Sequence, residues 1–117
     1  MTAKQLDARI SFQNDVAVIK LSGEIDSQVE DALNTAYQKA ESWRPKFILL
    51  DLAQVQYINS TGIALIVGLL SRARKTQIKL MVCGLSDHYL EIFRITRLAD
   101  FIEIFADENA AVAHAGS

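Results

Sequence analysis

One short polar segment carries the residues best suited to regulation or binding. It reads Asn59-Ser60-Thr61-Gly62 and leads into an apolar helical pattern. A phosphate on a hydroxyl at a helix N-terminus is stabilised by unpaired backbone N–H groups and by the helix dipole. Gly62 keeps this turn free of side-chain bulk, so that a partner can approach the hydroxyl. Two interpretations stand at this point: Ser60 is a modification site, or Asn59 or Ser60 is simply the N-cap of the helix.

A second polar segment, Gly23-Glu24-Ile25-Asp26, follows a predicted strand. In an open α/β sheet, binding residues gather at the carboxyl ends of the strands, where loops and helix N-termini converge. We therefore expect this segment to lie at the same edge of the sheet as Ser60. Asp26 or Ser27 is also suited to cap the helix that follows.

Catalysis and metal binding are poorly supported by the residue types present. A nucleophilic Ser60 would require a base, and the sequence offers His88 and His114. The turn also lacks the glycine two residues before the serine that a nucleophile elbow needs. Cys83 lies in an apolar run and is expected to be core filler, and one cysteine with two distant histidines makes no metal-ligand spacing. We expect no enzyme activity, no metal and no cofactor.

Length and charge narrow the class of protein further. The 117 residues suit one domain, 1–117, and half of them are apolar. A net charge of -2 provides no basic field for nucleic acid. Residues 1–10 lack the apolar stretch of a secretion signal, and the apolar stretch 62–70 is too short to span a bilayer. These features predict a soluble, cytoplasmic protein.

The hydrophobic periodicity predicts strands that alternate with helices. A hairpin is expected first, its second strand ended by Ser22-Gly23, and a later strand is expected to end at Asp51 before a short connection over 52–59. Strands are predicted at about 10–12, 16–21, 47–50, 78–83 and 101–105, and helices at about 27–42, 61–75, 86–96 and 107–115. This order implies an α/β domain with a mixed, mostly parallel sheet of about five strands, one antiparallel edge and about four flanking helices. Arg72, Arg74 and Lys75 fall in the last turn of the second helix, where they suit its dipole.

These segments, in this order and spacing, resemble the STAS domain, the fold of bacterial anti-sigma-factor antagonists. The resemblance spans nearly the whole chain. It is carried by the apolar strand over 47–51, the Asn59-Ser60-Thr61-Gly62 turn and the Gly23-Glu24-Ile25-Asp26 loop. The later stretch 81–86 and the apolar positions 92–93, 101 and 104–105 also follow the family pattern.

The resemblance implies a protein that binds an anti-sigma factor which is itself a serine kinase, and so releases a sigma factor. The kinase would phosphorylate Ser60 and break the complex, a PP2C-type phosphatase would restore it, and Asp26 would meet a basic residue of the kinase. Thr61 is a minor phosphorylation candidate, and Asn59 stands where many members carry Asp. The implied partner-binding residues are Glu24, Asp26, Asn59, Ser60, Thr61 and Gly62. An alternative within the same fold is a scaffold or switch subunit with another output, such as a lipid-transport complex, a stress-sensing assembly, or control of secretion or biofilm formation.

Overall fold

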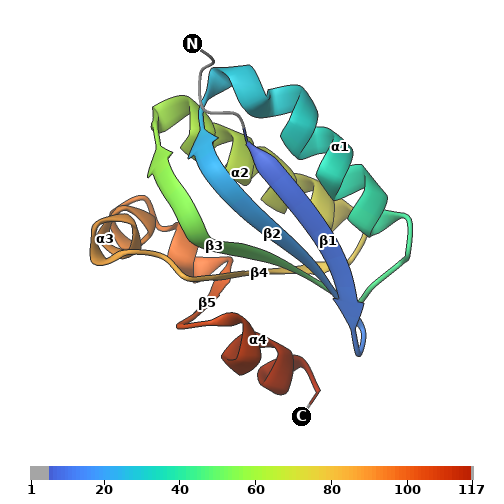
Figure 1. Cartoon of the computed structure of the whole chain (residues 1–117). Coiled ribbons are helices and arrows are strands. Elements are labelled where there is room, and N and C mark those ends of the chain that lie inside the picture. The colour runs from blue at the N-terminus through green and yellow to red at the C-terminus, as the bar shows by residue number, and fades with distance from the viewer. Residues whose placement is uncertain (1–5, 117) are drawn as a thin grey trace.

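An N-terminal hairpin begins the sheet in the computed structural model, which describes residues 6–116 (Figure 1). β1 (Asp7–Gln13) pairs antiparallel with β2 (Val16–Ile25). The turn between them places Asn14 at a φ of 49°, a left-handed conformation that asparagine tolerates better than most residues. The predicted N-terminal hairpin is therefore confirmed.

The described residues complete a five-stranded sheet in the order β1-β2-β3-β4-β5. The strands β3 (Phe47–Ile58), β4 (Lys79–Cys83) and β5 (Glu103–Phe105) continue from β2 in parallel. The helices are α1 (Glu30–Glu41), α2 (Ser60–Lys75), α3 (Asp87–Ile95) and α4 (Glu108–Ala115), with short 3₁₀ turns at Ser27–Val29 and Leu98–Asp100. This is the predicted α/β architecture, mostly parallel with one antiparallel edge.

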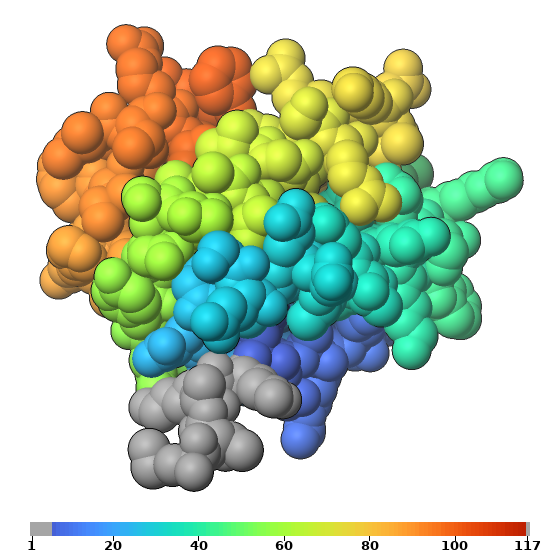
Figure 2. Space-filling model, turned by 90° about the horizontal axis from the view of Figure 1, so that it is seen from above, coloured from blue at the N-terminus to red at the C-terminus, as the bar shows by residue number. Residues whose placement is uncertain are grey.

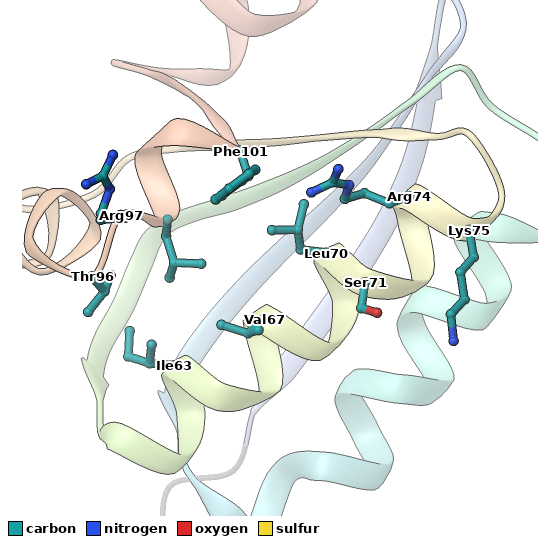
Figure 3. Close-up of a pocket in the computed structure, with 10 residues that line it drawn as sticks. Ile63, Val67, Leu70, Ser71, Arg74, Lys75, Thr96, Arg97 and Phe101 are labelled. Carbon is teal, nitrogen blue, oxygen red and sulfur yellow. The ribbon is translucent and has the colours of Figure 1, made fainter.

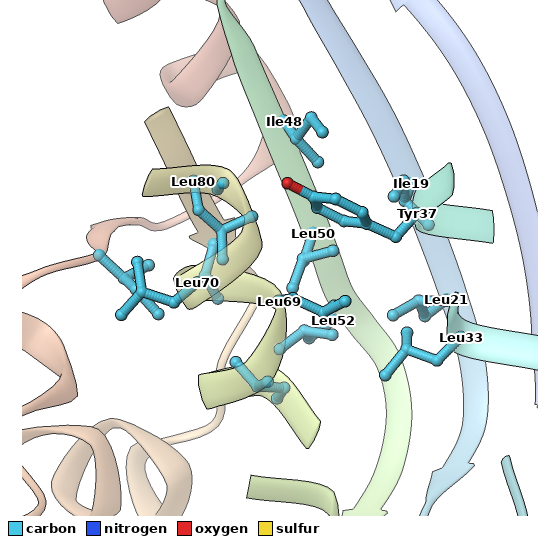
Figure 4. Close-up of a cluster of buried hydrophobic side chains, with 14 of the residues drawn as sticks. Ile19, Leu21, Leu33, Tyr37, Ile48, Leu50, Leu52, Leu69, Leu70 and Leu80 are labelled. Atoms are coloured by element: carbon cyan, nitrogen blue, oxygen red, sulfur yellow. The ribbon is translucent and has the colours of Figure 1, made fainter. Parts of the chain in front are cut away.

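The sheet is covered on both faces, which explains why its central strands are apolar runs. The larger core lies between the sheet and α1, α2 and α3; in Figure 4, Leu33 and Tyr37 of α1 lie near Leu50 of β3 and Leu69 of α2. A smaller core lies under α4 on the other face. It contains Val16, Val18, Leu49, Met81, Cys83 and Ala111. Within residues 6–116, no helix has the length and apolar character that crossing a membrane requires.

Two strands run further than the sequence predicts. β2 continues through Ser22 and Gly23 to Ile25, and β3 continues past Asp51 to Ile58, so the predicted connection over 52–59 is wrong. The pairing of β3 with β4 ends at Asp51 and Cys83. Beyond that point β3 pairs, among residues 6–116, with β2 alone. The register of this ribbon shifts between Lys20 and Ser22 and between Gly23 and Glu24. Its polar residues face solvent in this ribbon, and for that reason the segment resembles a loop in sequence.

The last predicted strand is shorter than expected. Leu98–Asp100 forms a 3₁₀ turn that begins after Arg97, which has a φ of 66°. β5 therefore starts at Glu103, and Phe101 lies on the surface before it.

Candidate functional site

The β2–β3 ribbon brings the two polar segments of the sequence together. Glu24 is opposite Tyr57, Ile25 is opposite Ile58, and the Asn59 N–H donates to the Ile25 carbonyl oxygen at 3.2 Å. Figure 2 shows the consequence on the surface, where the end of β2 and the start of α2 lie side by side. The expectation that both segments share one edge of the sheet agrees with this arrangement.

Gly62 is what allows α2 to start so close to β2. A Cβ atom at this position would lie 2.2 Å from the Ile25 carbonyl oxygen and 2.9 Å from Cγ2 of Ile58. Contacts of 3.4 Å or more are ordinary for such atoms, so any side chain here would push the helix away. Gly62 is buried, and its contribution to the edge is this close approach.

Asn59, and not Ser60, is the N-cap of α2. Asn59 has an extended backbone conformation, and its Oδ1 accepts a hydrogen bond from the Gly62 N–H at 2.8 Å. Ser60 is the first residue of the helix, and its side chain and that of Thr61 are exposed. Because the cap is made by Asn59, the Ser60 hydroxyl is not needed to begin the helix.

Asp26 has a structural role beside its candidate binding role. Its Oδ1 accepts a hydrogen bond from the Gln28 N–H at 2.9 Å and so caps the 3₁₀ turn before α1. Asp26 and Glu24 are both half-buried. This leaves part of each carboxylate open to a partner at the same edge as Ser60.

Two tyrosines at this edge are not among the binding residues that the sequence predicts. Tyr57 is 51% exposed, because strand alternation turns it away from its buried neighbour Ile58. Tyr89 of α3 is buried, and its hydroxyl accepts a hydrogen bond from the Ile58 N–H at 2.8 Å. The alternation of buried and exposed positions that exposes Tyr57 can be seen in the sequence. It was missed because residues 52–59 were predicted to be a loop and not a strand.

The remaining candidates for chemistry lie elsewhere in the fold. His88 is exposed at the start of α3, with its ring 4.8 Å from that of Tyr89. His114 lies in α4, with its Nε2 3.1 Å from a carboxylate oxygen of Glu103. Burial, with a smaller effect from Asp51, raises the pKa of the Cys83 thiol to about 12.

No metal centre is formed by the residues that the structure describes. Among them, no three His, Cys, Asp or Glu side chains are placed to hold an ion. The arrangement at the edge supports recognition of another macromolecule, since it combines an exposed hydroxyl, two carboxylates and an exposed aromatic ring.

The chain is similar to known proteins over most of its length. The STAS domain family matches residues 7–111 of the chain. The anti-sigma-B factor antagonist of Listeria monocytogenes is 35% identical over 86 residues, which cover 74% of this chain and 75% of that protein.

Solved structures share the fold at lower identity. An anti-sigma factor antagonist from Mycobacterium paratuberculosis superposes with a TM-score of 0.84 at 18% identity, covering 97% of this chain and 96% of the other. The Bacillus cell fate determinant SpoIIAA in its phosphorylated form superposes with a TM-score of 0.72 at 16% identity, covering 93% and 99%. The family match over most of the chain and the identity to the Listeria protein identify the chain as a member of the STAS domain family, among the anti-sigma-factor antagonists.

Proposed function

We propose that this chain is a non-enzymatic regulator that binds an anti-sigma factor and thereby releases a sigma factor. The anti-sigma factor is a serine kinase that phosphorylates Ser60, and a PP2C-type phosphatase reverses the modification. The docking surface, which we call the Ser60 edge, is formed by Glu24, Tyr57, Asn59, Ser60 and Thr61 together with Asp26, which meets a basic residue of the kinase. The protein acts where these partners act, in the cytoplasm.

The observation that carries this proposal is the exposed Ser60 hydroxyl in the first turn of a helix that is capped by a different residue. Phosphorylation adds about -1.5 to -2 of charge and three acceptor oxygens. The N-terminus of α2 stabilises this charge, so the helix stays folded. The phosphate therefore changes the docking surface and not the fold, and the solved phosphorylated SpoIIAA has the same fold as this chain.

A phosphorylation experiment tests the assignment of the site. The purified chain is incubated with the kinase and Mg-ATP, and the product is analysed by mass spectrometry. We expect one phosphate on the wild type and on Thr61→Ala, and none on Ser60→Ala. Phosphate on Ser60→Ala, or its loss from Thr61→Ala, would move the site to Thr61.

A binding experiment tests the switch itself. We expect Ser60→Ala to hold the kinase as tightly as the wild type and Ser60→Asp to bind at least ~10-fold more weakly, a difference of ~1.4 kcal/mol. Equal affinity of the two variants would exclude control by charge at this position. Pull-down from the native cell extract, with and without phosphatase, then shows whether a sigma factor or another output protein is released.

A further inference from the structure

A second surface of interest lies along α2, on the side that faces the segment after α3. It is an open groove of about 620 Å³ between α2 and the 3₁₀ turn Leu98–Asp100 (Figure 3). Ile63, Val67 and Leu70 of α2 line one wall, and Leu98 and Phe101 line the other. We call this surface the α2 groove.

The α2 groove exposes more apolar surface than core packing requires. Val67 is 43% exposed and Phe101 is 58% exposed, and both are large apolar side chains. Contiguous apolar patches on a soluble protein mark sites of interaction. Val67 lies on the exposed side of the helix, so its apolar surface is not used by the core.

One end of the α2 groove is positively charged. The Arg74 guanidinium lies 5.3 Å from the centre of the Phe101 ring, and Lys75 lines the same end. Arg97 also borders the groove, but its Nε lies 2.9 Å from Oδ2 of Asp100, and this carboxylate neutralises its charge. Within residues 6–116, neither Arg74 nor Lys75 has an ion-pair partner. The helix dipole explains cations in the last turn of α2, but not the placement of Arg74 over an exposed ring at the rim of an apolar groove.

We propose that the α2 groove binds an amphipathic helix of a protein partner whose polar flanks are acidic. The apolar wall of α2 presents side chains at positions i, i+4 and i+7, a spacing that the apolar face of a second helix can match. From Ile63 to Arg74 the wall extends ~16 Å, the length of three turns. Acidic flanks on the partner helix complement Arg74 and Lys75.

The charged end of the α2 groove lies far from the switch at Ser60. Arg74 lies fourteen positions after Ser60, a rise of ~21 Å along the helix axis. The Debye length at physiological ionic strength is ~8 Å, so a phosphate on Ser60 is largely screened from the charged end of the groove. The phosphorylated protein therefore loses its kinase and keeps this second docking surface.

A pair of fluorescein-labelled helical peptides tests the proposal by fluorescence anisotropy at ~0.15 M salt. Both are about 14 residues long with leucine at matching i, i+4 and i+7 positions; one carries Glu on its flanks and the other carries Lys in the same places. We expect the acidic peptide to bind at least ~10-fold more tightly. Val67→Asp should abolish binding, and the double variant Arg74→Glu/Lys75→Glu should reverse the preference for charge.

Two control variants make the result specific. Lys39→Glu/Arg44→Glu changes net charge equally at exposed positions outside the groove and should leave both affinities unchanged. Ser60→Asp should also bind the acidic peptide as the wild type does, whatever its affinity for the kinase. Circular dichroism confirms that each variant is folded.

Several outcomes would overturn the proposal. The acidic peptide could fail to bind, or both peptides could bind with equal affinity. Ser60→Asp could also lose binding of the acidic peptide, which would show that the groove is part of the Ser60 edge. Val67-dependent binding to phosphatidylglycerol vesicles without peptide binding would assign the groove to lipid. Val67-dependent dimerisation would assign it to a second copy of the chain.

Discussion

Replacing Gly62 by alanine tests whether the close approach of α2 to β2 holds the Ser60 edge together. The new Cβ would lie 2.2 Å from the Ile25 carbonyl oxygen, more than 1 Å inside an ordinary contact of 3.4 Å. The obstacle is backbone, which cannot rotate away as a side chain would. The start of α2 must therefore move, and this strains the hydrogen bond from the Asn59 N–H to Ile25.

The expected loss of folding stability has three contributions. Overpacking destabilises the fold by about 1–3 kcal/mol, and the weakened backbone hydrogen bond adds about 1 kcal/mol of destabilisation. The better helix propensity of alanine offsets up to about 1 kcal/mol. We expect Gly62→Ala to lower the free energy of unfolding by about 1–3 kcal/mol. In urea this shifts the unfolding midpoint downwards by ~1 M, measured by far-ultraviolet circular dichroism.

Gly68 provides a control within the same helix. A Cβ atom there meets nothing within 4 Å, so Gly68→Ala has the same gain in propensity without the collision. We expect this variant to be more stable than wild type by about 0.5–1 kcal/mol. An unfolding midpoint for Gly62→Ala at or above the wild-type value would refute the reasoning, as would equal destabilisation by the two substitutions.

Three further predictions concern caps, tyrosines and pH. Asn59→Ala should lower the free energy of unfolding, measured by urea denaturation, by about 1 kcal/mol. Asn59→Asp keeps the capping oxygen and should be at least as stable as wild type. Tyr89→Phe should lower the free energy of unfolding by about 1–3 kcal/mol, because it leaves the Ile58 N–H unpaired. Tyr37→Phe should leave the free energy of unfolding unchanged or raise it, because the buried Tyr37 hydroxyl has no hydrogen-bond partner within residues 6–116. Equal effects of the two substitutions would contradict this reasoning. Burial raises the pKa of the Cys83 thiol and of the Tyr37 phenol to about 12, from ordinary values of 9.0 and 10.0. The unfolded chain therefore loses these protons first, so the free energy of unfolding should fall as pH rises from 9 to 12, and Cys83→Ala should remove the part of the fall that begins near pH 9.

The Ser60 edge and the α2 groove divide the helix α2 between two tasks. Its N-terminal turn presents a hydroxyl that a kinase can modify, and one side of the helix presents an apolar wall, Ile63 to Leu70, that ends beside Arg74 and Lys75. Because the charged end of the groove lies more than a Debye length from Ser60, charge on Ser60 has little effect at that end.

Local patterns predicted most of the helices and the central strands. The period of Leu33, Ala36, Tyr37 and Ala40 predicted α1, and the helices predicted from about 86 and 107 begin, in the structure, at the N-caps Ser86 and Asp107. These features involve neighbours within one or two turns of the chain, so a single segment is enough to recognise them. The extension of β3 to Ile58 could not be recognised in this way, because its pairing partner lies more than thirty residues earlier in β2.

The sequence alone determined which residue types could form the site. They are a serine that follows an asparagine, two carboxylates in a separate segment, and a glycine three residues after the asparagine. The tertiary structure decided which of them cap a helix, which are exposed and which touch. It assigned the cap to Asn59, opposed Glu24 to Tyr57, and placed Gly62 against the Ile25 carbonyl. It also built the α2 groove from residues 63–75 and 96–101, which are adjacent only after folding. The reason is physical: propensity and capping act between near neighbours, whereas strand register, burial and charge complementarity depend on segments that meet when the core closes.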